Sequence, residues 1–305
     1  MATANGSLCN ISGSVSENGS LVGCMESDIE QATVESIQAW FAYLEPAHKL
    51  IANLAVADFI MGVRGVFIFP ITFLIEFPPK IICLGHGAVV TLSALASMNF
   101  LIVINVDRYI AISRPLHYYQ IVTPRVILVM AVLAWSFAFF ASVMTFIGNR
   151  WQPDLPCIFD IISSRISVIL ISVIVLTLGA AIVSIYAYMM MIAKHHQRQI
   201  HQEPISSGLQ EAVATGKSFS AELAKHLKLA KTFGIVVGAF VVCWTPYLFL
   251  TLLSVADVYH DTFGVATGFG FLMADSNFFI NFFIYALKSS QFRAAFRAVL
   301  PSRGH

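Results

Sequence analysis

Charged residues are scarce in this chain of 305 residues. Asp, Glu, Lys and Arg make up 11% of it, whereas roughly a quarter is usual in a soluble domain, and 57% of the residues are hydrophobic. This balance predicts a multi-pass membrane protein rather than a globule with a large core, so a lipid bilayer is the expected surrounding. The formal net charge of +1 argues against a surface that binds nucleic acid.

Cysteine is also rare, and its spacing fits no common metal site. No two of the five cysteines lie within the short spacing that zinc sites use, so we expect no bound metal from them. No basic segment followed by an apolar run opens the chain, so no cleavable signal peptide is expected. The apolar segments also lack the internal inverted repeat of a transporter and the paired nucleophile and base of an enzyme.

The N-terminal segment is polar and rich in Ser, Gly and Asn. Asn5, Asn10 and Asn18 each begin an Asn-X-Ser sequon, which predicts glycosylation of a disordered extracellular tail over residues 1–34. Cys9 and Cys24 in this tail either form a disulfide or remain free thiols.

Six apolar segments follow, each long enough for a transmembrane helix of about 20 residues. Runs of this length without alternation cannot be barrel strands, so the predicted fold class is an all-α membrane bundle. The expected spans are approximately 50–75, 83–108, 126–148, 165–193, 229–253 and 262–287. The bundle thus covers residues 50–287, and residues 288–305 are expected to form an amphipathic helix and a short cytoplasmic tail.

Lys and Arg are concentrated on one side of this predicted bundle. Most of the 18 fall on the same side as Arg108, which the positive-inside rule assigns to the cytoplasm. That side includes a polar loop predicted over residues 194–226. His195 and His196 in this loop either bind a metal or, as we expect, belong to a solvated basic segment.

The second span ends abruptly in Asp107, Arg108 and Tyr109, where the acid and the guanidinium can pair at the boundary between membrane and water. This triplet, followed by Pro115 and Leu116, resembles the cytoplasmic end of the third helix in rhodopsin-like G-protein-coupled receptors. Further segments resemble motifs of that family in the same order: Asn53–Asp58, Cys83, Trp135, Tyr186, Cys243–Pro246 and Asn281–Tyr285. By this resemblance the six spans correspond to the family's second to seventh helices.

The resemblance implies a receptor of the plasma membrane that transmits binding of an extracellular small-molecule ligand to a heterotrimeric G protein. Pro246 removes a hydrogen bond inside an apolar helix, which kinks the helix and provides a pivot. The residues implied in G-protein coupling are Asp107, Arg108, Tyr109, Leu116, Tyr186 and Tyr285.

The ligand is constrained mainly by what is missing. Val90 stands where amine receptors carry an Asp, so the usual amine-binding mode is not expected, and the last span has no Lys before Lys288 to hold retinal. Arg64 and Asp275 either pair with each other or flank a polar or zwitterionic ligand. The expected ligand-binding residues are Arg64, His86, Val90, Trp244, Tyr247 and Asp275.

Two further sites are expected within the bundle. Cys83 opens a span and Cys157 lies in the next loop on the same side, so the two either form a disulfide or remain thiols. Asp58 is costly in the middle of a span, so a functional role is expected. The resemblance implies an allosteric sodium ion, with no other cofactor, in a pocket of four residues: Asp58, Ser97, Asn277 and Asn281.

Three positions depart from the family pattern. Leu178 replaces a proline of the fifth helix and Phe282 replaces the proline after Asn281, so we expect these helices to be straighter and stiffer than usual. His226 stands in place of the acid that often locks Arg108, which predicts a weaker lock and higher basal activity.

The family's first helix is not visible as an apolar span. Residues 35–49 resemble only its extracellular start and the loop after its cytoplasmic end, and roughly twenty residues between them are absent. We interpret the gap as a splice variant or a faulty gene model. The functional alternatives are therefore a signalling receptor and a truncated, non-signalling variant, with retention in the endoplasmic reticulum if the gap is real.

Overall fold

The computed structural model describes residues 46–75, 78–154, 157–202, 210–259 and 265–288. All of these belong to one compact unit, Pro46–His305. The predicted tail with its sequons, the remnant of a first helix before residue 46 and the amphipathic helix after residue 288 lie outside the described residues. They remain predictions.

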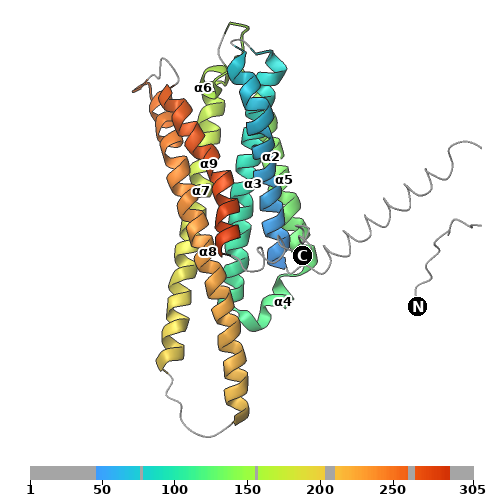
Figure 1. The fold of residues 1–305 in the computed structure, drawn as a ribbon, viewed down its shortest axis with the longest axis vertical. Helices are drawn as coiled ribbons and strands as arrows, with labels where there is room; N and C mark the ends of the chain where they lie inside the picture. Colours follow the sequence, from blue (N-terminus) through green and yellow to red (C-terminus); the bar gives the residue numbers. More distant parts are fainter. Residues whose placement is uncertain (1–45, 76–77, 155–156, 203–209, 260–264, 289–305) are drawn as a thin grey trace, which may run out of the picture. The chain divides into compact units, whose positions relative to one another are not determined.

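The described part of the chain is almost entirely helical, which confirms the all-α class. Six helices are long: α2 (Pro46–Leu74), α3 (Lys80–Ser113), α5 (Pro124–Ile147), α7 (Arg165–Gln202), α8 (Gln210–Val255) and α9 (Val265–Lys288). Short elements connect some of them: η1 (Pro115–His117), α4 (Tyr118–Ile121) and α6 (Phe159–Ile162). Figure 1 shows the long helices running side by side as a bundle.

Prolines set several of the helix starts. Pro46 begins α2 and Pro124 begins α5, positions where the missing N–H would be unsatisfied in any case. Thr123 caps α5, because its hydroxyl accepts a hydrogen bond from the Val126 amide at 3.4 Å. Residues 46–49 form the first turn of α2. The remnant of a first helix and loop that we predicted over 35–49 stays a prediction for the residues before 46.

The predicted six-span layout is not what the structure shows. Five helical stretches in the described ranges are long and apolar enough to cross a membrane: His48–Ile71, Lys80–Ser113, Pro124–Ile147, Arg165–His195 and Ala230–Val255. The sixth predicted span, now α9, is not among them. It carries three polar residues in an otherwise apolar sequence: Asp275, Asn277 and Asn281.

The predicted polar loop over residues 194–226 is wrong at both ends. Helix α7 continues to Gln202 and α8 begins at Gln210, so most of this segment is helical. Hydropathy detects contact with lipid, whereas polar residues such as Lys, Gln and Glu also continue a helix well in water. The sequence signals for a break, Pro204 and Gly208, lie between the two helices.

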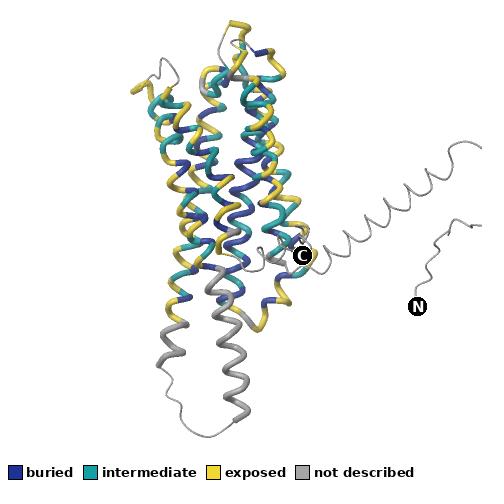
Figure 2. Tube along the Cα trace, in the orientation of Figure 1, coloured by how far each residue is buried: buried dark blue, intermediate teal, exposed yellow. Residues whose placement is uncertain are grey.

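Helix α3 lies at the centre of the bundle and packs against α2, α5, α7 and α8. Its middle is fully covered, with Leu95, Phe100 and Ile104 each at most 1% exposed. Large apolar side chains instead cover the outer faces, among them Phe59 on α2 at 71% exposure and Phe279 on α9 at 55%. Figure 2 shows buried positions concentrated in α3. An apolar exterior of this kind is expected where helices face lipid.

Candidate functional site

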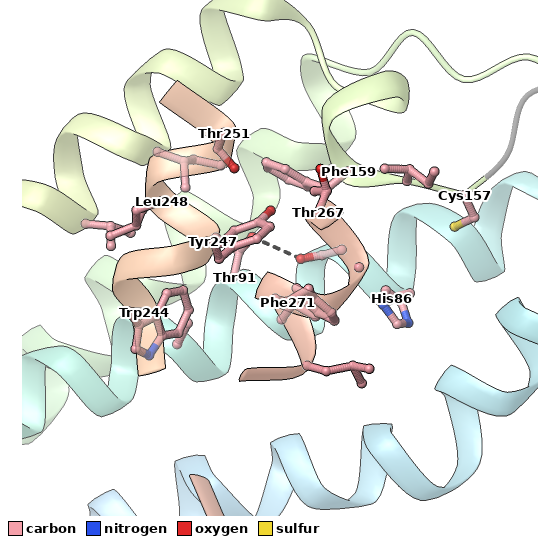
Figure 3. Close-up of a pocket in the computed structure, with 18 of the residues that line it drawn as sticks. His86, Thr91, Cys157, Phe159, Trp244, Tyr247, Leu248, Thr251, Thr267 and Phe271 are labelled. Carbon is pink, nitrogen blue, oxygen red and sulfur yellow. Dashed lines mark hydrogen bonds between the residues drawn. The ribbon is translucent and has the colours of Figure 1, made fainter. Parts of the chain in front are cut away.

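A cavity of about 640 Å³ lies between α3, α7, α8 and α9 (Figure 3). Its wall is mostly aliphatic and aromatic, as in Val90, Ile171 and Leu248, and none of the described residues that line it is Asp, Glu, Lys or Arg. The few polar side chains include Thr91, whose hydroxyl donates to the Gly87 carbonyl of its own helix at 2.9 Å. The volume suits a small molecule, and the wall suits an apolar one.

Aromatic rings in contact form the part of the wall made by α8 and α9. The ring centroids of Trp244 and Tyr247 are 6.4 Å apart and those of Tyr247 and Phe271 are 5.7 Å apart, both edge to face. Gly270 allows this approach, because a Cβ there would lie 3.1 Å from the Tyr247 backbone. The contact explains why α9 carries glycine at this position.

The six predicted ligand-binding residues divide into two groups. Those on α3 and α8, namely His86, Val90, Trp244 and Tyr247, line the cavity. Arg64 and Asp275 do not line it. Sequence reasoning missed Phe159, Thr251 and Phe271, which also contribute to the wall. A signal for Thr251 was available, since it lies one helical turn after Tyr247.

Arg64 and Asp275 meet each other, so the structure shows the pairing alternative. The Arg64 side chain is 1% exposed and its Nη2 donates to the Asp275 carboxylate. Its Nη1 lies 3.2 Å from His86 Nε2. A guanidinium has no acceptor, so His86 Nε2 accepts this hydrogen bond and the ring proton resides on Nδ1. The cluster therefore joins α2, α3 and α9.

The predicted disulfide between Cys83 and Cys157 is confirmed. It joins the first turn of α3 to the loop before α6, with the two Cα atoms 5.6 Å apart. The loop places Phe159 against α3, where its ring lies 3.8 Å from the position of a Cβ on Gly87. The disulfide thus holds one wall of the cavity in place.

Asp58 meets two of the three partners that the family resemblance implied, Ser97 and Asn281. Its Oδ1 accepts from Ser97 Oγ at 3.3 Å and its Oδ2 accepts from Asn281 Nδ2 at 3.1 Å. Asn277 Oδ1 and Asn281 Oδ1 are buried without a hydrogen-bond partner among the described residues. A carboxylate with two free amide oxygens is a donor set that fits a hard cation such as sodium.

At the end of α3, Asp107 and Arg108 pair within one helix. Arg108 Nε donates to Asp107 Oδ2 at 2.9 Å and Nη2 donates to the same oxygen at 2.5 Å. Tyr118 in α4, which sequence reasoning missed, donates its hydroxyl to Asp107 Oδ1 at 2.8 Å. Burial and the nearby Asp107 carboxylate raise the pKa of Tyr118, so this hydroxyl keeps its proton.

The other predicted coupling residues are more dispersed. Leu116 is 81% exposed, and Tyr109 packs on Tyr188 with ring centroids 5.7 Å apart. The Tyr186 hydroxyl reaches α8 so closely that a Cβ on Gly234 would lie 1.8 Å from it. The side chain of Tyr285 lies outside the described residues.

Comparison with known proteins agrees with these motifs. Residues 43–285 match the family described as 7 transmembrane receptor (rhodopsin family). The chain is 27% identical to cannabinoid receptor 1 of Xenopus laevis over 84% of its length, and 31% identical to the alpha-1A adrenergic receptor of Oryctolagus cuniculus over 83%. It is 28% identical to trace amine-associated receptor 4 of Mus musculus over 88%.

The coverage of these relatives differs. The chain spans 56% of the cannabinoid receptor and 60% of the adrenergic receptor, but 80% of the trace amine-associated receptor. The names of the relatives point to different kinds of ligand. Similarity alone therefore selects none of them for this chain.

Proposed function

The chain belongs to the rhodopsin family of seven-transmembrane receptors, and we propose that it acts as a G-protein-coupled receptor for a small extracellular molecule. The family is not an enzyme family, and the chain is a multi-pass membrane protein. The plasma membrane is the location that fits this role. The observation that carries the proposal is the cavity of about 640 Å³ beside Trp244, on the helix that also contains Pro246.

Ligand binding acts first on α8. Trp244 lines the cavity, packs on Phe240 with ring centroids 5.9 Å apart and precedes Pro246 by two residues. Pro246 cannot donate to the carbonyl one turn earlier, so α8 bends more easily here than elsewhere. A ligand that binds the bent and straight forms with different affinity shifts the population of α8 between them.

At the cytoplasmic end of the bundle, this motion of α8 changes the surroundings of Arg108. In the structure described here Arg108 is 3% exposed and bonded to Asp107. Movement of α8 away from α3 opens a cleft in which Arg108 can contact the G protein, with the exposed Leu116 as an apolar contact beside it. The residues proposed for coupling are Asp107, Arg108, Tyr109, Leu116, Tyr186 and Tyr285.

Asp58, Ser97, Asn277 and Asn281 are proposed as the holders of an allosteric sodium ion. A bound sodium ion would neutralise the Asp58 carboxylate and link α2, α3 and α9. The two amide oxygens without partners support this assignment, because buried acceptors are rarely left unsatisfied. Three of the four residues hold the resting arrangement through the hydrogen bonds from Ser97 and Asn281 to Asp58.

The test of receptor function is nucleotide exchange on a purified G protein. We expect Arg108→Ala to abolish exchange without lowering the amount of receptor in the membrane, because this residue lies near one end of α3 and not in the bundle centre. The measurement is made on the chain as it stands and on a version with about twenty apolar residues inserted between Tyr43 and Glu45. Unchanged exchange in Arg108→Ala would remove the role proposed for it.

A truncated, non-signalling variant is the second candidate. It is supported by the exposed apolar side chains of α2 and α9, the helices that the family's first helix covers. In this second candidate no span precedes α2, and the positive-inside signal holds the N-terminal tail in the cytoplasm. Asn5, Asn10 and Asn18 then stay unmodified in this chain and become glycosylated after the insertion. A mobility shift with glycosidase on the chain as it stands would contradict this topology.

A further inference from the structure

The guanidinium of Arg64 sits in the kind of site that proteins use to bind organic cations. Its Cζ lies 5.8 Å from the ring centroid of Phe69 and 5.4 Å from that of Phe271, both within the roughly 6 Å range of a cation–π contact. His86 completes the group, with its ring centroid 6.4 Å from each of the two phenylalanines. The Asp275 carboxylate supplies the counter-charge.

The rings of Phe69, His86 and Phe271 form a cage around the Arg64 guanidinium, and this aromatic cage separates the ion pair from the cavity. Phe69, His86 and Phe271 all line the cavity, whereas Arg64 and Asp275 do not. Figure 3 shows His86 and Phe271 among the side chains around it. Arg64 is only 1% exposed, so a molecule in the cavity meets the rings and not the charges behind them.

The charges of the cage cancel within the chain. Asp275 is already paired with Arg64, and no Asp or Glu is among the described residues of the cavity wall. A cationic ligand would lose its hydration without finding a counter-ion and would lie near the charge of Arg64. A neutral apolar ligand meets neither cost.

We propose that Arg64 fills, from within the chain, the position that a cationic ligand would take, so that the cavity accepts an uncharged, largely apolar ligand. This inference rests on the proposed receptor function, because it assigns the ligand class of the same cavity. It also gives the aromatic cage a definite role, which is to hold an internal cation.

The first test leaves the Arg64–Asp275 ion pair unchanged and uses three small thiol reagents. In a background with Cys9→Ser, Cys24→Ser and Cys243→Ala, a single Val90→Cys places one thiol in the cavity wall. It is labelled with ethyl methanethiosulfonate, its trimethylammonium analogue and its sulfonate analogue, and each rate is divided by the rate with free cysteine. Val258→Cys, at a position 73% exposed, is the matched control.

We expect the cation-to-neutral rate ratio at position 90 to be about tenfold or more below the ratio at position 258, because an unpaired charge must lose hydration to enter the cavity. The anion should be disfavoured as well. Equal ratios at the two positions would overturn the assignment of an uncharged ligand. This arm needs no change in the ion pair.

The second test empties the internal site. Arg64→Met keeps an unbranched side chain but leaves Asp275 unpaired, so the cation-to-neutral ratio at position 90 should rise by about tenfold, and Arg64→Met with Asp275→Asn should return it to the original value. An unchanged ratio in Arg64→Met would overturn internal occupancy. If Arg64→Met folds poorly, tetramethylammonium added during expression should restore its folded yield. The proposal would be contradicted if tetramethylammonium did not raise the folded yield of Arg64→Met while the variant with both Arg64→Met and Asp275→Asn folded well.

These rates do not depend on a G protein. If the receptor proposal is wrong, nucleotide exchange is unchanged in Arg108→Ala, while the cation-to-neutral labelling ratio at position 90 is still as predicted. Failure of the ligand-class proposal would appear in the labelling ratios, with the effect of Arg108→Ala intact. The two failures are therefore distinguishable.

Discussion

Two buried arginine–carboxylate pairs occupy different depths of the bundle and connect the chain in different ways. Arg108 and Asp107 are adjacent in sequence and lie on one helix, so the ion pair itself lies within α3, and Tyr118 of the short α4 also donates to Asp107. Arg64 and Asp275 are separated by 211 positions and join α2 to α9, with His86 adding α3. The first pair can open without separating helices, whereas opening the second removes a link between three of them.

Depth also decides what a freed charge can do. Arg108 lies in the last two turns of α3, where opening of the bundle end can bring its guanidinium to water or a protein partner. Arg64 is 1% exposed and lies against the rings of Phe69 and Phe271 beside the cavity. We therefore assign switching to the cytoplasmic pair and structural linkage to the pair beside the cavity.

The largest effect on the free energy of unfolding is expected from breaking the Arg64–Asp275 ion pair. Arg64→Ala or Asp275→Ala alone leaves a buried unpaired charge and should cost about 3–5 kcal/mol, while the double variant should recover much of the folded yield. Folded yield and thermal unfolding in detergent provide the measurement. Strictly additive losses would show that the two side chains do not interact in the folded protein.

A matched control exists on the surface. Arg165 and Asp257 also pair, at 2.8 Å, but their side chains are 51% and 59% exposed. Arg165→Ala should therefore change stability by about 1 kcal/mol or less. A cost as large as that of Arg64→Ala would mean that burial does not distinguish the pairs.

The next effect concerns the switch. Asp107→Asn removes the charge that holds Arg108, so basal nucleotide exchange should rise several-fold while the amount of folded receptor changes little. The reason is that the released guanidinium can be hydrated at the helix end. A fall in folded yield comparable to that of Asp275→Ala, without a rise in exchange, would assign both pairs to structure.

A smaller effect is expected at the contact between α8 and α9. Gly270→Ala places a methyl group 3.1 Å from backbone atoms of Tyr247, which cannot rotate away, so overpacking should cost about 1–3 kcal/mol. Gly268→Ala on the same helix meets nothing within 4 Å and is the control. Thermal unfolding of the two variants gives the comparison, and equal melting temperatures would show that the close approach carries no strain.

The smallest effect is expected at Tyr118. Tyr118→Phe removes one hydrogen bond to Asp107 and should cost about 1 kcal/mol, with a slight rise in basal exchange. Because the pKa of Tyr118 is raised above its ordinary value, the stabilising protonated form is complete below that value and is lost only as pH rises through the folded-state pKa. Exchange measured near neutral pH should therefore show no titration from this residue, and a tyrosine-dependent step there would contradict the assignment.

The sequence predicts well what depends on local pattern. The helices at α2, α3, α5, α7, α8 and α9 follow from apolar runs, and the bond between Asp107 and Arg108 follows from adjacency. The disulfide follows from two cysteines on the same side of the membrane. Each of these features requires little knowledge of how helices are rotated about their axes.

Features that depend on helix rotation or on water were not predictable. Nothing in the sequence decides whether Arg64 faces Asp275 or a ligand, since that choice depends on the packing of α2 against α9. The cage of Phe69, His86 and Phe271 follows from the same packing. Hydropathy also missed the polar ends of α7 and α8, because it measures preference for lipid and not helix formation.

The most direct test of this division of roles is a pair of spin-label distances in the presence and absence of nucleotide-free G protein. One pair of labels replaces Tyr119 and Lys231 at the cytoplasmic ends, and the other replaces the exposed Phe67 and Phe269 on α2 and α9. We predict that the G protein adds a longer distance between positions 119 and 231 and leaves the distance between 67 and 269 unchanged. A constant first distance together with a shift in the second would contradict the account.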